Sequence, residues 1–399
     1  MLLVLAALLA SGCGEAWSPE SIIEDLRVIG VKAEPAELKP GERATLSALI
    51  LDPTRPAAKS TVLWIGCDPD PFNLGRSACS NPEVLQDPST LTGGGALPPG
   101  VKVIGLNSAA SYTAPKDLFS LLASDDPRRQ TGTVGQVLAI AIAKESVGIP
   151  TEAELTALFE KVKNKELKAV VTLFRIKVSE SPTRNNNPKI SGFKVAGELQ
   201  RPGVRTRVFP AQKLEVGLEA PDDSFEPYIE VTPTTSEEKL ERLTSAWYST
   251  SGRFAAMRIA LRSEVKGSFT VPGDPEFPND KIPESRTGSF FVVLRDTRGG
   301  QDWIVHPFWI CDITAPEPWP TALRSPVNKG ELVVLEGTSL EGVLDVEVEG
   351  VGLTQGAVNP ATGNWEALIP PTVAPGTYPI TLHRKNCRVG PTGLLLTVP

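Results

Sequence analysis

Two histidines are the side chains from which this 399-residue chain would most readily build a general base. His306 lies in the strand-like segment 305–309, and His383 stands in another such segment beside Arg384. A Ser-His-Asp hydrolase needs the base within hydrogen-bond reach of a nucleophile, and no Gly-x-Ser-x-Gly sequence accompanies either histidine. The 47 acidic residues always offer carboxylate pairs, whose spacing depends on the fold. We therefore expect two structural histidines in a protein that works by binding and is not an enzyme.

The amino terminus is a short apolar run that closes on small residues and a cysteine, Ala10-Ser-Gly-Cys13. Such a run is too short to cross a bilayer core of about 30 Å. It resembles the lipobox of bacterial lipoproteins, with Ala where Leu is commoner at the first position. An ordinary secretory leader or a buried helix is the alternative.

That resemblance implies a signal peptide over residues 1–12, acyl chains such as palmitate on Cys13, and a lipidated tether over residues 13–20. Gly14, where Asp would indicate inner-membrane retention, favours the outer membrane. The sequence does not decide whether the chain faces the periplasm or the cell surface. Two or three acyl chains would make a stable anchor, because each buried methylene contributes about 0.8 kcal/mol.

Lipidation of Cys13 leaves an even number of cysteines, which are Cys67, Cys79, Cys311 and Cys387. Four cysteines allow three pairings. The local pairing joins Cys67 to Cys79 and leaves Cys311 to meet Cys387. A zinc site is the alternative, but no Cys-x-x-Cys occurs and the two histidines are isolated. An oxidising compartment favours two disulfides.

Acidic loops are the remaining chemical signal. Calcium binds hard oxygen ligands and can bridge β modules at their loop ends, although no loop has the twelve-residue EF-hand order. We regard these side chains as weak calcium candidates, with solvated turns as the alternative; they are Asp68, Asp70, Asp222, Asp223 and Asp296. No other metal and no cofactor is expected.

Composition excludes one class of partner. The formal net charge is −7 and no basic stripe with interleaved aromatic residues is present, which argues against nucleic acid. A sugar-stacking platform would need exposed, coplanar rings. The tryptophans in or beside strand-like segments are expected mostly to fill cores; they are Trp64, Trp247, Trp303, Trp309 and Trp365.

The order of elements predicts a mostly β chain. With 37 prolines and 34 glycines, turns should be frequent. Residues 25–33 alternate like a strand, and residues 41–51 place Ala44, Leu46, Ala48 and Ile50 on one side of a second strand. A third strand carries Trp64. This order resembles immunoglobulin-like and PKD-like modules of bacterial surface proteins.

The sequence Arg-Val-Ile-Gly-Val-Lys at 27–32 is similar to Lys-Ile-Ser-Gly-Phe-Lys at 189–194, and Trp64 corresponds to Trp247 in the same order of segments. We read two tandem copies of one antiparallel β-sandwich module, over residues 21–181 and 183–314. One amphipathic helix, about 151–165, is expected as an insertion in the first copy, because Leu155, Leu158 and Val162 share one face after a capping-box signature. A shorter helix is expected near residues 116–123.

A Pro-rich linker at 315–320 precedes a third module at 321–399. Segments 331–337, 344–349, 363–369 and 375–382 are expected strands, and Gly-Asn-Trp365 followed by Pro-Gly-Thr-Tyr378 resembles a bacterial immunoglobulin-like repeat. The sequence thus predicts a lipid-anchored protein of the cell envelope. Its expected partners are the membrane, reached through the anchor, and another envelope protein or a surface glycan. A glycan-binding lipoprotein and an envelope hydrolase are the alternatives to a structural or adhesive role.

Overall fold

The computed structural model describes residues 20–55, 60–69, 100–107, 109–144, 152–231, 235–261 and 265–399. Strands make up 52 % of the structure and helices 5 %, so the expectation of a mostly β protein with antiparallel sheets is confirmed. The chain divides into two compact units. The first comprises residues 1–199, 215–269 and 290–305, and the second comprises residues 200–214, 270–289 and 306–399. The boundaries of the three predicted modules stay predictions.

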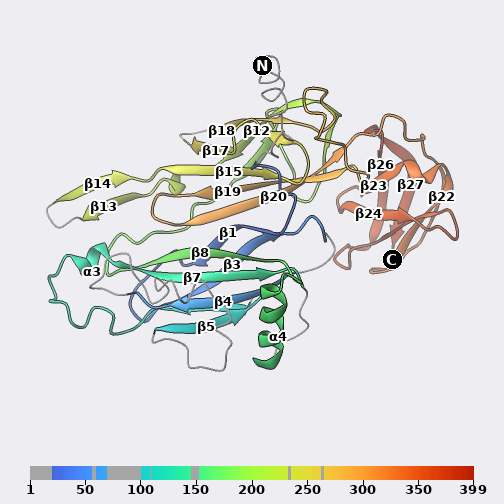
Figure 1. Ribbon diagram of the computed structural model, residues 1–399. Helices are drawn as coiled ribbons and strands as arrows, with labels where there is room; N and C mark the ends of the chain where they lie inside the picture. The colour runs from blue at the N-terminus through green and yellow to red at the C-terminus, as the bar shows by residue number, and fades with distance from the viewer. Residues whose placement is uncertain are drawn as a thin grey trace, which may run out of the picture. The chain divides into compact units, whose positions relative to one another are not determined.

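Eight strands of the first unit form one sheet in the order β1-β3-β6-β5-β4-β7-β8-β2 (Figure 1). All neighbours are antiparallel except β2 and β8, which are parallel. The strands are β1 (Arg27–Glu34), β2 (Glu37–Leu38), β3 (Arg43–Leu51), β4 (Thr61–Cys67), β5 (Val101–Leu106), β6 (Ala109–Thr113), β7 (Thr133–Ile142) and β8 (Ala169–Val178).

The sheet curls around a core to which both its first and its last strands contribute. Ala44 and Leu46 of β3 are fully buried there, and Ala48 and Ile50 pack against the same core, as the period-2 pattern predicts. The ring of Trp64 fills the centre, and its indole N–H donates to the carbonyl oxygen of Asn107 at 2.7 Å. The ring is therefore buried with its one hydrogen-bond donor satisfied, and this bond fixes the orientation of the indole.

Helix α4 (Glu152–Lys163) confirms the predicted insertion. Its Val162 packs on a second apolar cluster, formed by residues of β4 and β7 on the opposite face of the sheet. Thr151, the expected capping residue, lies outside the described residues. The prediction of a helix near 116–123 is wrong, because this stretch forms successive turns. The Ser120 N–H donates to the Asp117 carbonyl oxygen and the Leu122 N–H to the Phe119 carbonyl oxygen, and each of these bonds spans three residues, one fewer than in an α-helix.

A short helix, α3 (Arg128–Thr131), follows those turns. Over the described ranges, no helix is both long enough and apolar enough to cross a bilayer.

A second sandwich completes the first unit. One sheet has the order β10-β9-β12-β18-β16, and β20, β19, β15 and β17 are neighbours in the other. The strands are β9 (Gly192–Val195), β10 (Glu198–Leu199), β12 (Lys213–Glu219), β15 (Leu243–Ser249), β16 (Arg253–Phe254), β17 (Arg258–Leu261), β18 (Val265–Thr270), β19 (Thr287–Arg295) and β20 (Gln301–Ile310). β20 begins in the first unit and ends in the second.

The core of this sandwich is aromatic. The rings of Phe193, Trp247, Phe254, Phe269 and Phe290 form a contiguous cluster with centroids 4.8 to 6.3 Å apart. Tilted and edge-on ring pairs at these distances are favourable beyond the area they bury. Trp247 of β15, like Trp64 of β4, is fully buried.

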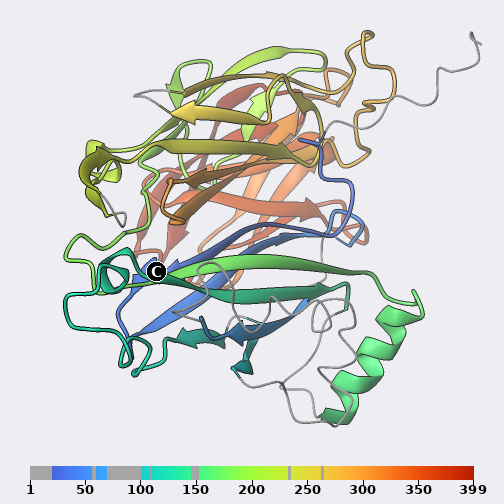
Figure 2. The same ribbon diagram turned by 60° about the vertical axis from the view of Figure 1, so that its left-hand side comes forward.

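The two sandwiches of the first unit share a third apolar cluster. Ile29 of β1 packs there with Tyr248 of β15 and Phe291 of β19, and Figures 1 and 2 show these strands side by side. Gly30 allows this approach, since a Cβ there would lie 3.2 Å from the ring of Trp303. The first unit is therefore one packed body.

The second unit contains a seven-stranded sandwich in the order β21-β22-β25-β24-β23-β26-β27. Its strands are β21 (Trp319–Arg324), β22 (Leu332–Thr338), β23 (Val343–Val348), β24 (Gly352–Val358), β25 (Trp365–Leu368), β26 (Gly376–Arg384) and β27 (Val389–Val398), with a 3₁₀ turn η4 (Leu340–Gly342). The four predicted strands are present as β22, β23, β25 and β26. The sequence did not predict β24 and β27, and β21 begins inside the predicted linker.

The parallel pairing seen between β2 and β8 recurs in the second unit, where the short strand β11 (Thr206–Val208) lies parallel to residues 308–310 of β20. In both cases a two- or three-residue strand pairs with the end of the last long strand of a sandwich. The interpretation of residues 21–181 and 183–314 as two copies of one module stays a prediction.

Candidate functional site

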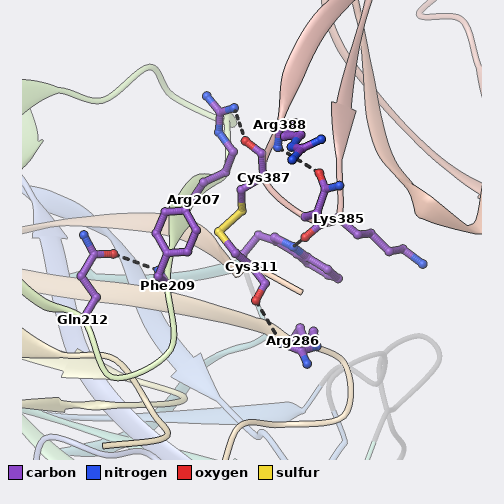
Figure 3. The surroundings of a disulfide bond; sticks show 10 residues. Arg207, Phe209, Gln212, Arg286, Cys311, Lys385, Cys387 and Arg388 are labelled. Atoms are coloured by element: carbon purple, nitrogen blue, oxygen red, sulfur yellow. Dashed lines mark hydrogen bonds between the residues drawn. A yellow bond between two sulfur atoms is a disulfide. The ribbon is translucent and has the colours of Figure 1, made fainter. Parts of the chain in front are cut away.

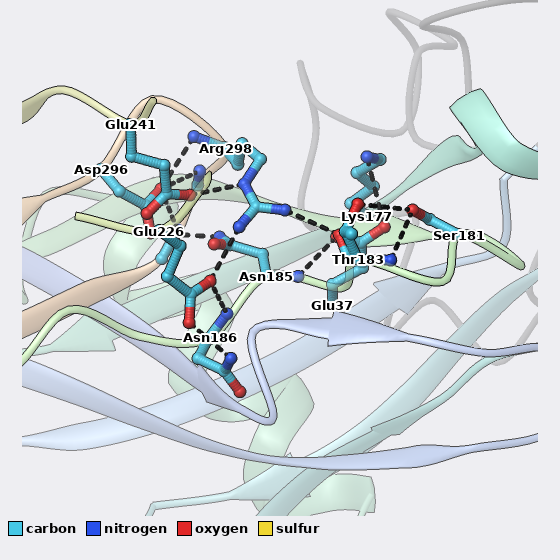
Figure 4. A network of polar contacts seen from close by, with 12 residues as sticks. Glu37, Lys177, Ser181, Thr183, Asn185, Asn186, Glu226, Glu241, Asp296 and Arg298 are labelled. Atoms are coloured by element: carbon cyan, nitrogen blue, oxygen red, sulfur yellow. Dashed lines mark hydrogen bonds and ion pairs between the residues drawn. The ribbon is translucent and has the colours of Figure 1, made fainter. Parts of the chain in front are cut away.

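The β19–β20 turn projects one arginine into a cluster of carboxylates. The guanidinium of Arg298 donates to the Glu241 carboxylate, to Glu226 Oε2 at 2.8 Å and to the Thr183 carbonyl at 2.9 Å (Figure 4). Its Cζ lies 4.8 Å from the ring centroid of Tyr228. Planar guanidinium groups suit such multiple contacts. Arg298 thereby ties together three segments that are distant in sequence.

The turn that presents Arg298 is held by one carboxylate. Asp296 Oδ1 accepts the backbone N–H groups of Arg298, Gly299 and Gly300 at 2.7 to 2.8 Å. Gly299 has a φ of +105°, and a Cβ on Gly300 would lie 2.2 Å from Asp296 Oδ2. Two glycines are therefore needed here, and the sequence expectation of a turn at Asp296 is met.

The network continues through the segment that joins the two sandwiches (Figure 4). Asn185 donates its side-chain N–H to Asp296 Oδ2 at 3.1 Å and its backbone N–H to Glu37 Oε2 at 2.9 Å. Glu37 is fully buried and also meets Ser179 and Lys177. A buried carboxylate is tolerated when it is paired in this way.

Arg298 and its partners form the base of a two-stranded ribbon, β13 (Pro227–Val231) and β14 (Ser236–Leu240). The short 3₁₀ turn η3 (Asp222–Ser224) precedes it. Figure 1 shows the ribbon extending past the ends of β15 and β19. We call it the β13–β14 ribbon.

A groove of about 640 Å³ lies at the base of the β13–β14 ribbon. This volume is within the range of small-ligand sites. Its lining residues are Tyr228, Lys239, Leu240, Glu241, Arg242 and Thr297.

Glu241 is the electrostatically unusual member of the groove. Burial raises the pKa of its carboxyl to about 7; hydrogen bonding to Arg298 opposes this rise, and the nearby Asp296 and Glu226 carboxylates add to it. A buried acid with a raised pKa beside a groove is a feature of functional sites, although structural networks also produce it. The arrangement offers recognition of a bound group.

The sequence-predicted cysteines have different outcomes. Cys311, next to the end of β20, is bonded to Cys387, in the turn between β26 and β27, so this pairing is confirmed (Figure 3). The Trp309 indole donates to the Lys385 carbonyl at 2.9 Å beside it, and Arg207 donates to the Cys387 carbonyl at 3.3 Å. Cys67 is buried at the end of β4, whereas Cys79 and the lipidation candidate Cys13 lie outside the described residues. Those two assignments stay predictions.

Both histidines are buried in the second unit. His306 Nε2 lies 2.7 Å from the Thr206 hydroxyl, and burial lowers the pKa of His306 to about 4. His383 Nε2 lies 2.9 Å from the carboxylate of Glu347, which Arg201 also contacts at 3.2 Å. Each ring is thus held by a neighbouring polar side chain.

The weak calcium candidates are dispersed. Asp68 is paired with Lys102 at 2.7 Å, and Asp223 with Lys189 at 2.9 Å. Asp222 begins η3, Asp296 holds the turn described above, and Asp70 lies outside the described residues. In the ranges that the structure describes, no three His, Cys, Asp or Glu side chains converge as a metal site would require.

The strand tryptophans serve mainly as core. Trp64, Trp247 and Trp365 are fully buried and Trp309 is 6 % exposed. Trp303 is half-buried against Gly30, with Lys32 Nζ 5.3 Å from its ring centroid. These five rings do not form an exposed coplanar platform. Trp319, predicted to lie in the Pro-rich linker, begins β21 and is 70 % exposed.

The fold is that of a multi-sandwich β protein, and comparisons with known proteins give no closer assignment. No family model and no curated protein sequence matches the chain. Among solved structures it is similar to the glucan-utilisation protein SGBP-B of Bacteroides ovatus, with 14 % identity over 54 % of this chain and 47 % of that one and a TM-score of 0.18. The chain thus spans about half of that protein.

Two further similarities are of the same order. One is to the adhesin InvE of Yersinia pseudotuberculosis, with 11 % identity, coverages of 86 % and 74 % and a TM-score of 0.20. The other is to the periplasmic chaperone SfaE, with 10 % identity, coverages of 52 % and 98 % and a TM-score of 0.23. At these values none of them indicates what this chain binds.

Sequence reasoning missed the β13–β14 ribbon and its anchoring residues. A signal was present, because Pro233 interrupts the sequence between the apolar residues Tyr228, Ile229 and Val231 and the segment 236–240. The role of Arg298 had no such signal: its partners Glu226 and Glu241 are 72 and 57 residues away.

Proposed function

We propose that this chain is a lipid-anchored protein of the bacterial cell envelope that works by binding another envelope protein, without turnover. The observation that supports this best is the β13–β14 ribbon. It carries exposed apolar side chains, Ile229 at 46 % and Leu240 at 62 % exposure, on a projection whose base is held by buried ion pairs. Two apolar side chains on one projecting element offer a partner an apolar surface to contact.

The anchor rests on the resemblance of residues 10–13 to a lipobox. Acylation of Cys13 would hold the chain at the membrane and leave the β units free to reach a partner. We place the protein in the outer membrane on the same resemblance, since Gly14 follows the cysteine.

A protein partner is preferred over a glycan for a physical reason. Sugar rings stack on exposed aromatic faces, and four of the five strand tryptophans are buried in cores. The β13–β14 ribbon offers apolar side chains and backbone hydrogen-bonding groups, which suit a polypeptide.

Photo-crosslinking in intact cells tests the proposal. A photo-crosslinking amino acid replaces Leu240 in the ribbon and, as a matched control, Leu395 of β27, which is 55 % exposed. We expect a discrete adduct from position 240 that is absent from position 395. Equal adducts from both positions, or none from 240, would overturn binding through the ribbon.

The anchor needs a separate readout. Growth with an alkyne-bearing palmitate should label the wild-type chain and leave Cys13→Ser unlabelled. An unlabelled wild-type chain would refute the anchor. Protease treatment of intact cells then decides the face: cleavage without lysis means that the units face outward, and protection until the outer membrane is opened means that they face the periplasm.

A further inference from the structure

The β13–β14 ribbon has a strand edge with no neighbour among the described residues. β13 and β14 form a two-stranded sheet by themselves. Helix α3 approaches β13, whereas no other described strand pairs with β14. An unpaired edge presents a row of backbone N–H and C=O groups that can pair with another chain.

The register sorts the ribbon into two unlike faces. Pro227 lies opposite Leu240 and Ile229 opposite Glu238, so these side chains share one face with Val231. The other face carries Tyr228, Glu230, Glu237 and Lys239. A strand added beside β14 would meet Ser236, Glu238 and Leu240 on one face and Glu237 and Lys239 on the other.

The charge of the ribbon selects the kind of strand that can be added. β13 and β14 carry three glutamates, Glu230, Glu237 and Glu238, and one basic residue, Lys239, which is paired with Glu230 and lies 3.7 Å from Glu237. The flanking Glu226 and Glu241 are paired with Arg298, so the acidic excess of the ribbon comes from the two strands. Like charges placed opposite each other across strands are destabilising. A second copy of the same ribbon, an anionic lipid surface and nucleic acid are all disfavoured by this charge. A basic polypeptide is favoured.

We propose that the outer edge of β14 pairs with an extended segment of a partner protein in which Lys or Arg alternates with apolar residues. The backbone of the segment hydrogen-bonds to β14. Its apolar side chains lie on the face of β14 that carries Leu240, and its cationic side chains lie on the other face, beside Glu237. This inference deepens the proposed function, on which it rests, by naming the chemistry of the partner.

Three synthetic peptides test it with the purified, folded chain. The first alternates lysine with valine and isoleucine over eight residues. The second has the same sequence with N-methyl groups on every second backbone nitrogen, which keeps the charge and removes the pairing edge. The third replaces lysine by glutamate. Fluorescence anisotropy measures binding, and hydrogen exchange locates it.

We expect the first peptide alone to bind and to slow amide exchange within Ser236–Leu240. The variant Glu237→Lys/Glu238→Lys should weaken its binding by about tenfold, whereas Glu160→Lys/Glu166→Lys, the same charge change at exposed positions of α4 and the turn after it, should leave binding within about twofold.

If the N-methylated peptide binds as tightly as the first peptide, strand pairing is refuted. If Glu160→Lys/Glu166→Lys weakens binding as much as Glu237→Lys/Glu238→Lys does, the effect comes from net charge alone and the ribbon is not the binding site. Both outcomes differ from failure of the proposed function. If the crosslink from position 240 is present while the peptides do not bind, the ribbon is a contact surface and the strand-pairing inference is wrong.

Discussion

The titration of Glu241 provides a stringent test of the network at the base of the ribbon. The pKa of this carboxyl rises from an ordinary 4.5 to about 7 because burial outweighs its contact with Arg298. An acid with a raised pKa binds protons more tightly in the folded state, so stability is lost as pH rises from about 4.5 to 7. The difference between these values corresponds to about 3 kcal/mol of unfolding free energy in the first unit.

Glu241→Gln removes the charge and keeps the shape and a hydrogen-bond acceptor for Arg298. We expect this variant to lose the pH dependence and to match or exceed the wild-type stability near pH 8. Carboxyl NMR gives the midpoint directly, and hydrogen exchange of β13, β14 and β15 gives the local stability. Thr297→Ala, which alters the same groove without removing an ionisable group, should keep the wild-type slope. A midpoint at or below 4.5 would show that Arg298 outweighs burial and would refute the reasoning.

Three further predictions concern single contacts. Arg298→Ala should destabilise the ribbon base by about 3 to 5 kcal/mol, because it leaves Glu241 buried without its partner, and adding Glu241→Gln should restore part of that loss; no restoration in urea unfolding would contradict the pairing. The second unit should lose stability as pH falls from 6.5 to about 4, because burial lowers the pKa of His306 and the folded state resists its protonation. Comparing proton NMR spectra of the wild type and His306→Gln should identify the His306 resonance, with a titration midpoint near 4. A midpoint near 6.5 would refute burial as the cause of the lowered pKa. Cys311→Ser/Cys387→Ser should lower the unfolding free energy of the second unit by about 4.5 kcal/mol, because the bond closes a loop of 76 residues and so reduces the entropy of the unfolded chain. An unchanged denaturation midpoint would show that this loop is constrained in the unfolded state by other means.

The β content was predictable because the patterns that specify it are local. Alternation over residues 43–51 placed Ala44 and Leu46 in the core, and β3 has them there. The recurrence of tryptophan in β4 and β15 reflects the need for a large ring at the centre of each sandwich. The disulfide between Cys311 and Cys387 is one of the three pairings that four cysteines allow, and it was preferred because Cys67 and Cys79 are close in sequence.

What the sequence did not predict depends on distant partners. The packing of Ile29 on Phe291 that joins the two sandwiches requires both sheets to be in place, and neither strand pattern distinguishes it from ordinary burial. The ribbon was missed for a related reason. Its apolar side chains face solvent, so a reader who assigns apolar residues to cores has no place for Ile229 and Leu240.

The disulfide of the second unit also determines how the chain transmits tension. A pull on the carboxyl terminus reaches Cys387 after only twelve residues and passes through the sulfur–sulfur bond to Cys311. Strands β21 to β26 lie within the closed loop, outside the line of force. An extended chain spans about 3.5 Å per residue, so the 76-residue loop would be about 260 Å long if it were fully extended. The oxidised bond prevents this extension. Under load, strands β21 to β26 can therefore be drawn out only after the bond is reduced and their sandwich unfolds.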